Sequence, residues 1–528
     1  MRFKSLKVGA KSTFAVLCAS VMPMHALAQE VTLKSADGAI NISGQLLEHS
    51  DTSYKIKTAL GELNIASAGI ECIGSGCPEV KVVNADVQFA GSDTVGLGMM
   101  PLLMAGYASH LGAEASIENT GKHDQVVAAL VGEEGFGDDL GSYLVTSTGS
   151  GDAFKALLSG SAQVGMASRR IKPAEARELR DAGAGNMISP DQEHIVAVDS
   201  LVVVTNSANP VSELSLDQLS GIFSGQITNW AEVGGENAPI VVVTRPDGSG
   251  TRSVFENAIF RGSNAQIAPS AKIGNGNVEI ADTVNADENA IGYVGYAFQR
   301  GNKALPLINE CGIRTSADSF SAKTEEYALQ RRLYFYTRQD QFDSATEEFI
   351  NFATSTAADG VIAKSGFIDL SVERREQTVD GARGATLASA SPANFEGSVA
   401  HDMLRTMQGF DRLSTTFRFR TGSTNLDERA EVDMERLVEF LEGQPEGTKV
   451  MFVGFTDSVG AFDANHALSQ SRAQRALSVA RNYAGERLPN LQFAAAGFGE
   501  VAPTACNTSD TGRATNRRVE VWLQNSNG

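Results

Sequence analysis

Three segments rich in glycine and hydroxyl side chains stand where an apolar run gives way to a helical pattern. They are residues 91–94 (Gly-Ser-Asp-Thr), 148–151 (Thr-Gly-Ser-Gly) and 245–252 (Arg-Pro-Asp-Gly-Ser-Gly-Thr-Arg). The first N–H groups of a helix lack intrahelical partners and carry partial positive charge, so they attract oxyanions. Glycine lets the backbone approach a ligand closely, and hydroxyl groups add donors. Together the three segments predict an anion site.

Each segment taken alone is typical of a turn or a helix cap, and an isolated arginine is usually a solvated surface group. A ligand is favoured because the segments recur within one domain and arginines stand beside two of them. These arginines are Arg245 and Arg252 in the third segment, and Arg169 and Arg170 soon after the second.

A second pair of residues near the C-terminus could recognise a zwitterion. Asp457 ends an apolar run, and Arg472 follows fifteen residues later in the first turns of an expected helix. The carboxylate suits an ammonium group, and the guanidinium can clamp a carboxylate in bidentate fashion. The alternative from the residues alone is a structural Asp–Arg salt bridge.

The large middle part of the chain, residues 87–370, reads as α/β. Continuous Val/Ile runs such as 201–205 and 240–244 predict strands buried on both faces, hence mostly parallel sheets. Amphipathic helices are expected at 153–159 and 216–223. This length suffices for two lobes with a ligand in the crevice between them.

Residues 29–86 read as a small β domain, because short runs alternate apolar and polar side chains with period two. Cys72 and Cys77 enclose a short Gly-rich loop that a disulfide could close in an oxidising compartment. No convergent polar cluster stands out there, so no activity is assigned. Cys311 and Cys506 fall in different domains and are expected as two separate buried thiols.

Residues 371–410 are polar, rich in Gly, Ala and Ser, and without sustained periodicity, so a flexible linker is expected. Residues 411–528 form the last domain. Its pattern is strand, helix (428–442), strand, helix (468–483) and further strands.

The N-terminus and the overall charge indicate the compartment. A basic start, a short apolar run and Ala-Leu-Ala before Gln29 predict a signal peptide at residues 1–28. The 528 residues hold 44 Lys+Arg against 63 Asp+Glu, a net charge of −19. A chain this acidic repels nucleic acid and anionic lipid, so neither class of partner is expected. The 7 histidines show no zinc-like spacing, so no metal or cofactor is expected.

The order of the middle segments resembles the periplasmic phosphate-binding proteins of ABC importers. The matching runs are Gly-Ser-Asp-Thr-Val, Thr-Gly-Ser-Gly, Val-Gly-Met-Ala-Ser-Arg and Arg-Pro-Asp-Gly-Ser-Gly-Thr-Arg-Ser-Val-Phe, with similar segments at 216–230 and 291–296. The resemblance implies a two-lobed type II binding protein that closes around one phosphate. The ligand donors it implies are Thr94, Ser150, Arg245 as the charged anchor, Ser249, Gly250 and Thr251.

One departure from this family concerns selectivity. Some members place an aspartate where Ser168 stands, and it accepts the proton of hydrogen phosphate, which sulfate lacks. Here Ser168 is followed by Arg169, whose guanidinium could pair with a dianion more strongly but discriminate less by protonation. Phosphate is the leading ligand, with other tetrahedral oxyanions left open.

The C-terminal residues resemble the OmpA-like peptidoglycan-binding domain. The shared features are Gly-x-Thr-Asp at a strand end, Asn-x-x-Leu-Ser-x-x-Arg-Ala, and Asn-Arg-Arg-Val-Glu. That family binds the diaminopimelate of peptide stems. The residues carried over are Asp457, Asn465, Arg472 and one of Arg517 or Arg518, while Phe455 replaces a common histidine and is expected to pack.

The combined interpretation is an exported solute-binding protein that captures inorganic phosphate and is held on peptidoglycan in the periplasm of a Gram-negative bacterium. The outer membrane and an ABC permease are further candidate partners. The alternative is a wall-anchored interaction or sensing protein whose middle domain does not bind phosphate. An enzyme is not expected, because Ser150 and Ser249 lie in no triad-like or nucleophile-elbow motif and a P-loop lysine is absent.

Overall fold

The computed structural model describes residues 30–525, except for 36–39, 51–52, 60, 67–69, 78–83, 123, 133–136, 380, 420–425 and 427–429. The expected signal peptide, residues 1–28, lies outside this part of the chain. None of the helices in the described segments is both long enough and apolar enough to cross a membrane. The chain divides into two compact units, residues 1–79 and residues 80–528.

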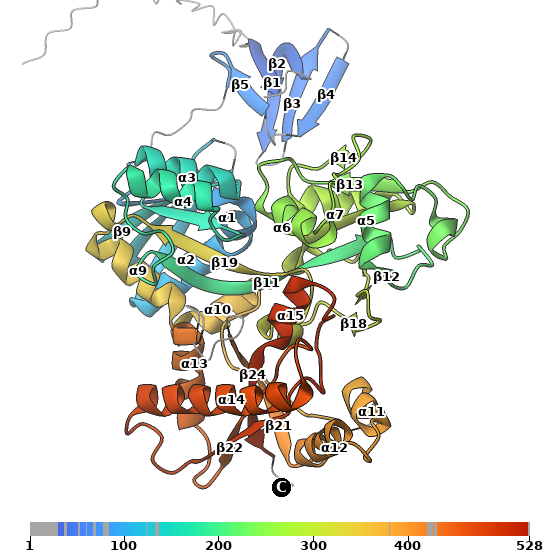
Figure 1. The fold of residues 1–528 in the computed structure, drawn as a ribbon. Coiled ribbons are helices and arrows are strands. Elements are labelled where there is room, and N and C mark those ends of the chain that lie inside the picture. The colour runs from blue at the N-terminus through green and yellow to red at the C-terminus, as the bar shows by residue number, and fades with distance from the viewer. Residues whose placement is uncertain are drawn as a thin grey trace, which may run out of the picture. The chain divides into compact units, whose positions relative to one another are not determined.

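The first unit is one antiparallel sheet with the strand order β4-β3-β2-β1-β5 (Figure 1). Its strands are β1 (Glu30–Ser35), β2 (Asn41–Ser50), β3 (Ser53–Thr58), β4 (Gly61–Ala66) and β5 (Ile70–Ile73). Alternate side chains, such as Val31, Leu33 and Ile56, are buried on one face. A disulfide joins Cys72 to Cys77, the pair indicated by the sequence.

The second unit begins with a two-lobed central domain built on one long sheet. The strand order is β14-β13-β15-β11-β19-β10-β6-β9-β8-β7, with β16 beside β11. Strand β11 (Glu193–Thr205) pairs with β19 (Gln330–Thr337) through residues 193–200 and with β15 (Ala290–Gly295) through residues 201–205. We therefore define lobe 1 as residues 84–200 and 330–370, and lobe 2 as residues 201–329. Strands β11 and β19 connect the lobes.

Lobe 1 packs helices around a core that includes Phe89, Tyr107 and Phe349. Its other elements are β6 (Val87–Ser92), α1 (Asp93–Gly98), α2 (Met100–His110), β7 (Ala113–Asn119), β8 (Gln125–Gly132), β9 (Asp139–Thr148), α3 (Ser150–Ser159), β10 (Val164–Ala167), α4 (Pro173–Asp181), α9 (Ser344–Thr354) and α10 (Asp359–Lys364). Its apolar stretches are buried on both sides of the sheet, as the sequence predicts.

Lobe 2 has its own core, centred on Phe223, Phe255 and Tyr293. It comprises β12 (Leu214–Ser215), α5 (Leu216–Ser224), β13 (Val241–Thr244), α6 (Gly250–Ile259), β14 (Lys272–Ile273), α7 (Asn277–Ala286), β16 (Lys303–Ala304), β17 (Leu307–Ile308), β18 (Arg314–Thr315) and α8 (Ser319–Lys323).

The expectation of mostly parallel sheets in the central domain is wrong. The β7-β8-β9 meander and the connecting strands β11 and β19 make antiparallel pairs, which gives a mixed sheet.

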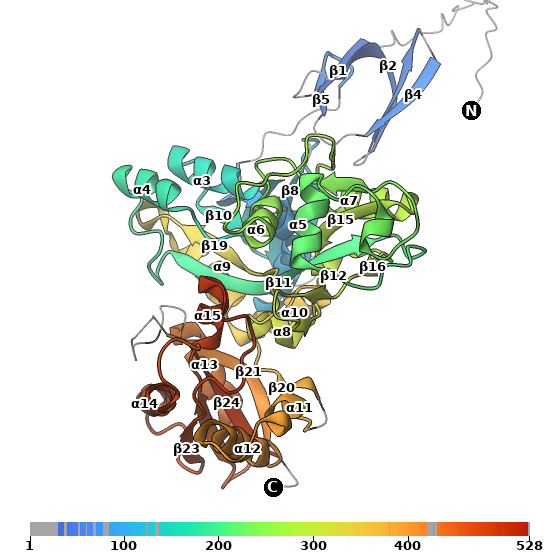
Figure 2. The ribbon, with the colours of Figure 1, turned by 45° about the vertical axis from the view of Figure 1, so that its right-hand side comes forward.

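The C-terminal domain is a sheet of order β20-β21-β24-β22-β23 covered by helices (Figure 2). Its elements are β20 (Arg374–Arg375), α11 (Ala382–Ser389), α12 (Phe395–Met407), β21 (Phe410–Arg418), α13 (Ala430–Glu442), β22 (Lys449–Gly454), α14 (Phe462–Ala484), β23 (Gln492–Gly497), α15 (Asp510–Asn516) and β24 (Arg518–Gln524). Helix α14 begins six residues before the expected start, and α15 was not expected.

Residues 371–410, expected as a flexible linker, are mostly folded onto this domain. Strand β20 pairs with β21, and Leu387, Val399 and Met403 from α11 and α12 are buried against Trp522 and its neighbours. These few apolar residues are enough to seat two short helices, although the composition is dominated by small and polar side chains. A free tether of this length is therefore not what the chain forms.

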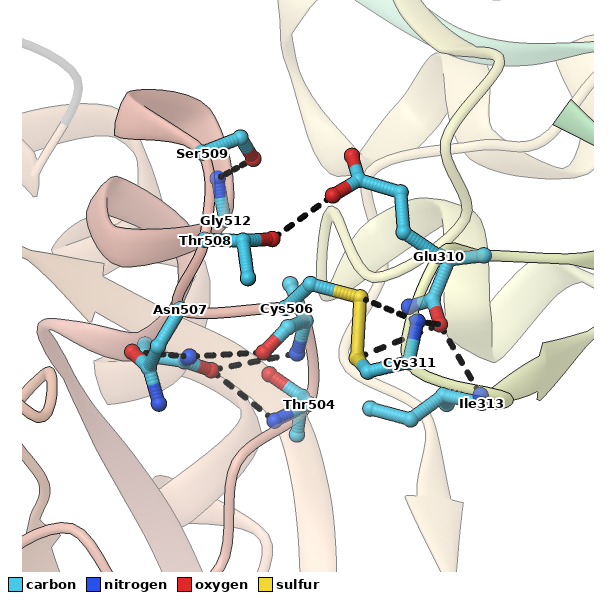
Figure 3. Close-up of a disulfide and its surroundings, with 12 residues drawn as sticks. Glu310, Cys311, Ile313, Thr504, Cys506, Asn507, Thr508, Ser509 and Gly512 are labelled. Atoms are coloured by element: carbon cyan, nitrogen blue, oxygen red, sulfur yellow. Dashed lines mark hydrogen bonds between the residues drawn. A yellow bond between two sulfur atoms is a disulfide. The ribbon is translucent and has the colours of Figure 1, made fainter. Parts of the chain in front are cut away.

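The expectation of separate thiols at Cys311 and Cys506 is also wrong. A disulfide joins them, with the two Cα atoms 5.7 Å apart (Figure 3). Cys311 lies in the loop between β17 and β18 of lobe 2, and Cys506 precedes α15. The pairing depends on how the C-terminal domain lies against the central domain, which the sequence does not reveal.

Candidate functional site

The three Gly/Ser/Thr segments meet between the two lobes. Helices α1 and α3 of lobe 1 and α6 of lobe 2 begin there, after β6, β9 and β13 respectively. The hydroxyl groups of Thr94, Ser150 and Thr251 are buried, with exposed fractions of 0%. Ser249 caps α6, because its side chain accepts a hydrogen bond from the N–H of Arg252. Helix starts and hydroxyl donors from both lobes thus converge on one place.

The contact between the lobes is close at Ser150, Ser168 and Gly250. The two serine Oγ atoms are 3.1 Å apart, and the N–H of Ser168 donates to Ser150 Oγ at 3.0 Å. A Cβ on Gly250 would lie 2.2 Å from Ser150 Oγ and 2.5 Å from Ser168 Oγ. Glycine is required at this position, because any side chain would push the start of α6 away from the lobe 1 hydroxyl groups.

Arg245 is the cationic centre of this cluster. Its side chain is 1% exposed, and its Nη2 donates to Asp93 Oδ2 across the lobes at 3.0 Å and to the Asn275 carbonyl at 3.3 Å. Its Nε and Nη1 are buried and lack a hydrogen-bond partner among the residues that the structure describes. Two unsatisfied donors on a buried cation are costly unless an acceptor occupies the site.

Four residues of the cluster were missed by the sequence analysis. Arg331 of β19 donates from Nη1 to Thr251 Oγ1 at 2.8 Å, while its Nε and Nη2 are held by the buried Asp199 of β11. Asn277, at the start of α7, donates to Thr94 Oγ1 at 3.1 Å. Asp93 is the fourth, through its pair with Arg245. For Asp199 and Arg331 the sequence did contain a signal, because a charged residue inside an apolar strand indicates a buried polar partner.

Arg169 does not join the anion cluster. Its Nη1 and Nη2 donate to Glu175 at 2.9 and 2.6 Å, and its guanidinium lies over the Phe154 ring. An acidic residue of its own lobe therefore holds the Arg169 guanidinium in this structure, and the pairing of Arg169 with a bound dianion stays a prediction.

The C-terminal domain has a separate polar pocket of about 390 Å³. Its lining includes Asp457, Asn465, Arg472 and Arg517 of the predicted set, together with Thr456, Val459, Leu468, Asp510 and Arg513. Asp457 lies in the loop between β22 and α14, just after the end of β22, while Asn465 and Arg472 project from α14. Residues from three parts of the sequence thus form one pocket with both charge signs.

The charges in this pocket are closely coupled. Asp457 Oδ2 accepts a hydrogen bond from Arg517 Nη1 at 2.7 Å, and the side chain of Asn465 donates to the Asp457 carbonyl at 3.2 Å. Burial, aided by the nearby charge of Arg517, lowers the pKa of Arg472 to about 10. An anionic group entering the pocket would relieve this cost, which suits a ligand carboxylate.

Arg518 lies outside the pocket. It is fully buried, pairs with Glu520 at 2.7 Å and lies 4.1 Å from the ring centroid of Phe455. Burial lowers the pKa of Arg518 to about 10, and Glu520 opposes this shift. Of the two candidates Arg517 and Arg518, only Arg517 is among the pocket's lining residues. Phe455 packs beneath Arg518, as expected.

Comparison with known families agrees with this arrangement. Residues 108–357 match the PBP superfamily domain, and residues 418–517 match the OmpA family. The chain joins a PstS-like binding-protein domain, the central domain above, to a C-terminal OmpA domain. The expected fold class, a two-lobed α/β domain preceded by a small β domain and followed by an α+β domain, is confirmed.

The relatives of the binding-protein domain are distant. Phosphate-binding protein PstS of Bacillus subtilis is 29% identical over 235 residues, covering 44% of this chain and 73% of the relative. PstS of Borreliella burgdorferi is 24% identical over 186 residues, covering 34% and 66%. A solved ABC-type phosphate transport receptor from Vibrio cholerae is 28% identical and covers 54% of this chain and 99% of its own, with a TM-score of 0.40.

Proposed function

We propose that this protein captures inorganic phosphate between the two lobes of the binding-protein domain while its OmpA domain holds it on peptidoglycan in the cell envelope. The observation that carries the first part is the pair of unpartnered buried donors on Arg245. They lie where helix starts and hydroxyl groups from both lobes converge. The names of the PstS relatives support phosphate as the anion.

The donor set supports binding and not hydrolysis. Thr94, Ser150, Ser249 and Thr251 offer hydroxyl groups, Gly250 offers a backbone N–H at the start of α6, and Arg245 offers charge. Within the described part of the chain, Ser150 Oγ is hydrogen-bonded to Ser168 and not to a histidine or carboxylate that could act as a base. The PstS relatives from Bacillus subtilis and Borreliella burgdorferi are binding proteins by name as well.

Asp93 supports a protonated tetrahedral anion. A carboxylate inside a cluster built for anions repels a fully ionised dianion such as sulfate, but it can accept a hydrogen bond from the proton of hydrogen phosphate. Ser168 supplies no such acceptor charge, whereas Asp93 Oδ2 lies 3.0 Å from Arg245 Nη2. We assign to Asp93 the selectivity that Ser168 leaves open.

The pocket around Asp457 and Arg472 supports the second part of the proposal. Diaminopimelate is a zwitterion, and the pocket offers a carboxylate together with the guanidinium groups of Arg472, Arg513 and Arg517. The salt bridge between Asp457 and Arg517 then exchanges partners with the ligand's ammonium and carboxylate groups.

Calorimetric titration tests the proposal. The mature chain is first stripped of bound anion by mild unfolding and refolding, then titrated with phosphate and separately with sulfate. Micromolar or tighter binding of phosphate, with sulfate at least tenfold weaker, is the expected result. Absence of heat with either anion, in a protein whose circular dichroism shows it folded, would reject phosphate capture.

A further inference from the structure

The OmpA domain is attached to lobe 2 through the loop before α15. The disulfide Cys311–Cys506 crosses the boundary, and Thr508 Oγ1 donates to Glu310 at 2.6 Å beside it (Figure 3). Nearer the connecting strands, Arg412 of β21 donates to Glu326 at 2.7 Å. Tyr327 and Leu329, just after Glu326, belong to the core of lobe 2. One side of the OmpA domain is thus fixed to lobe 2 by a covalent bond and a buried ion pair.

The same domain also contacts lobe 1. Arg436 of α13 is 6% exposed, and it donates to Asp359 Oδ2 at 2.8 Å and to the Thr354 carbonyl at 2.6 Å. These acceptors belong to α10 and α9, which pack on the core of lobe 1. Figure 1 shows α13 directly below α10, and in both ribbon views α15 lies below β11 (Figures 1 and 2).

The interface beside the lobe 2 attachments is not continuously packed. A cavity of about 750 Å³ lies there, with a lining that includes Arg170 of lobe 1, Ile259 of lobe 2 and Phe419 of the OmpA domain. Its lining also includes Cys506 and Glu326, so the cavity separates the two lobe 2 attachments. Separate contacts of this kind can be made or broken one at a time, unlike a single close-packed interface.

The pocket around Asp457 and Arg472, which we call the wall pocket, is connected to the loop that carries Cys506. The carbonyl of Asn507, next to Cys506, accepts a hydrogen bond from Arg513 Nη1 at 2.7 Å, and its side chain accepts one from the N–H of Ser458 at 3.3 Å. Arg513 lines the pocket, and Ser458 follows the pocket residue Asp457. A ligand that shifts these residues therefore acts on the loop that is bonded to lobe 2.

We propose that the OmpA domain is a brace across the two lobes, which stabilises the lobe arrangement seen in the structure and couples the wall pocket to the anion site. The lobes are joined by β11 and β19, so opening them changes the separation between Cys311 in lobe 2 and Asp359 in lobe 1. A domain attached to both resists that change. The coupling of ligands rests on the proposed function, whereas the bracing itself does not.

Coupling between two sites is reciprocal. If the brace favours the closed lobes, a peptidoglycan peptide bound in the wall pocket changes the affinity for phosphate by some factor. Bound phosphate then changes the affinity for that peptide by the same factor. Factors of about 5 to 150 are typical of such coupling.

The first experiment needs no ligand. Non-cysteine spin labels on the exposed positions Glu178 (lobe 1) and Glu236 (lobe 2) report the distance between the lobes in the full chain by electron resonance. Arg436→Ala, and separately Cys311→Ser with Cys506→Ser, are expected to broaden the distribution toward longer distances. Asp359→Asn is the milder second variant, since the bond from Arg436 to Thr354 can persist. Arg405→Ala, on the exposed surface of α12, is the matched control.

Distance distributions that match the wild type in all three brace variants would overturn the proposal. If they broaden while the wild type binds no phosphate, the brace stands and the proposed function fails. If the wild type binds phosphate, its titration is repeated with a saturating diaminopimelate-containing tetrapeptide. A change in phosphate affinity of at least fivefold, lost in Arg436→Ala, is the expected result. Equal affinities with and without the peptide would overturn the coupling.

Discussion

Arg245→Met is the substitution that most directly tests the anion site. It removes the two buried donors without a partner, Nε and Nη1, and keeps most of the side-chain volume. A hydrogen bond to a charged group contributes about 1.5–3 kcal/mol, so two contribute about 3–6 kcal/mol to the bound state. We expect phosphate affinity to fall by roughly 10²–10⁴-fold.

Stability should suffer less than binding, because the substitution also removes buried donors that are unsatisfied in the free site. The remaining penalty is Asp93, whose side chain is 12% exposed and loses its partner. The double variant Arg245→Met/Asp93→Asn removes that charge and should unfold at a temperature close to the wild type.

The assay is calorimetric titration of stripped protein, with thermal unfolding by circular dichroism on the same samples. Arg261→Met is the matched control, since Arg261 follows α6 and is exposed. A folded Arg245→Met variant that binds phosphate within threefold of the wild type would refute the reasoning from unpartnered donors. An equal loss in Arg261→Met would also refute it, because the effect would then be general charge and not the site.

Three further results are expected. Asp93→Asn should narrow the preference for phosphate over sulfate by about 10–100-fold in calorimetry, since one charged hydrogen bond is lost; an unchanged ratio would contradict the role of Asp93. Arg472→Ala should abolish sedimentation with isolated peptidoglycan while phosphate binding stays, whereas Arg481→Ala on exposed α14 surface should sediment normally. Burial lowers the pKa of His194 to about 4, below its unfolded value of about 6.5, so folding stability is lost as pH falls through this range. Between pH 8 and pH 4.5, urea unfolding should show a loss of about 2.5 kcal/mol in the free energy of unfolding, and His194→Gln should lack this loss.

The sequence could predict those parts of the site that lie on local motifs. Thr94, Ser150 and Ser249 each stand at a strand-to-helix junction, where the change of hydrophobic period is visible in a few residues. The junctions at Thr94 and Ser150 lie together because the parallel strands β6 and β9 end at the same edge of the sheet. Convergence of these two residues follows from the α/β pattern itself, whereas the approach of Ser249 depends on how lobe 2 lies against lobe 1.

The parts that could not be predicted depend on contacts between distant segments. Arg331 reaches Thr251 from a strand that lies 80 residues later in the chain, and its partner Asp199 is 132 residues away. The pairing of Cys311 with Cys506 spans 195 residues and requires two domains to be docked. No local spacing encodes such neighbours, although a charge within an apolar strand does indicate a buried partner.

The folding of residues 371–410 changes how the two proposed activities relate. A flexible tether would let each domain work alone, with reach set by linker length. Here Ser319 of lobe 2 donates to Glu373 at 2.9 Å, and Glu373 in turn bonds to Ser414 of β21. The connection is therefore part of the interface between the domains. Under the proposed function, attachment to the wall would then fix the orientation of the anion site as well as its location, and a partner that receives phosphate would have to approach the lobes at that place.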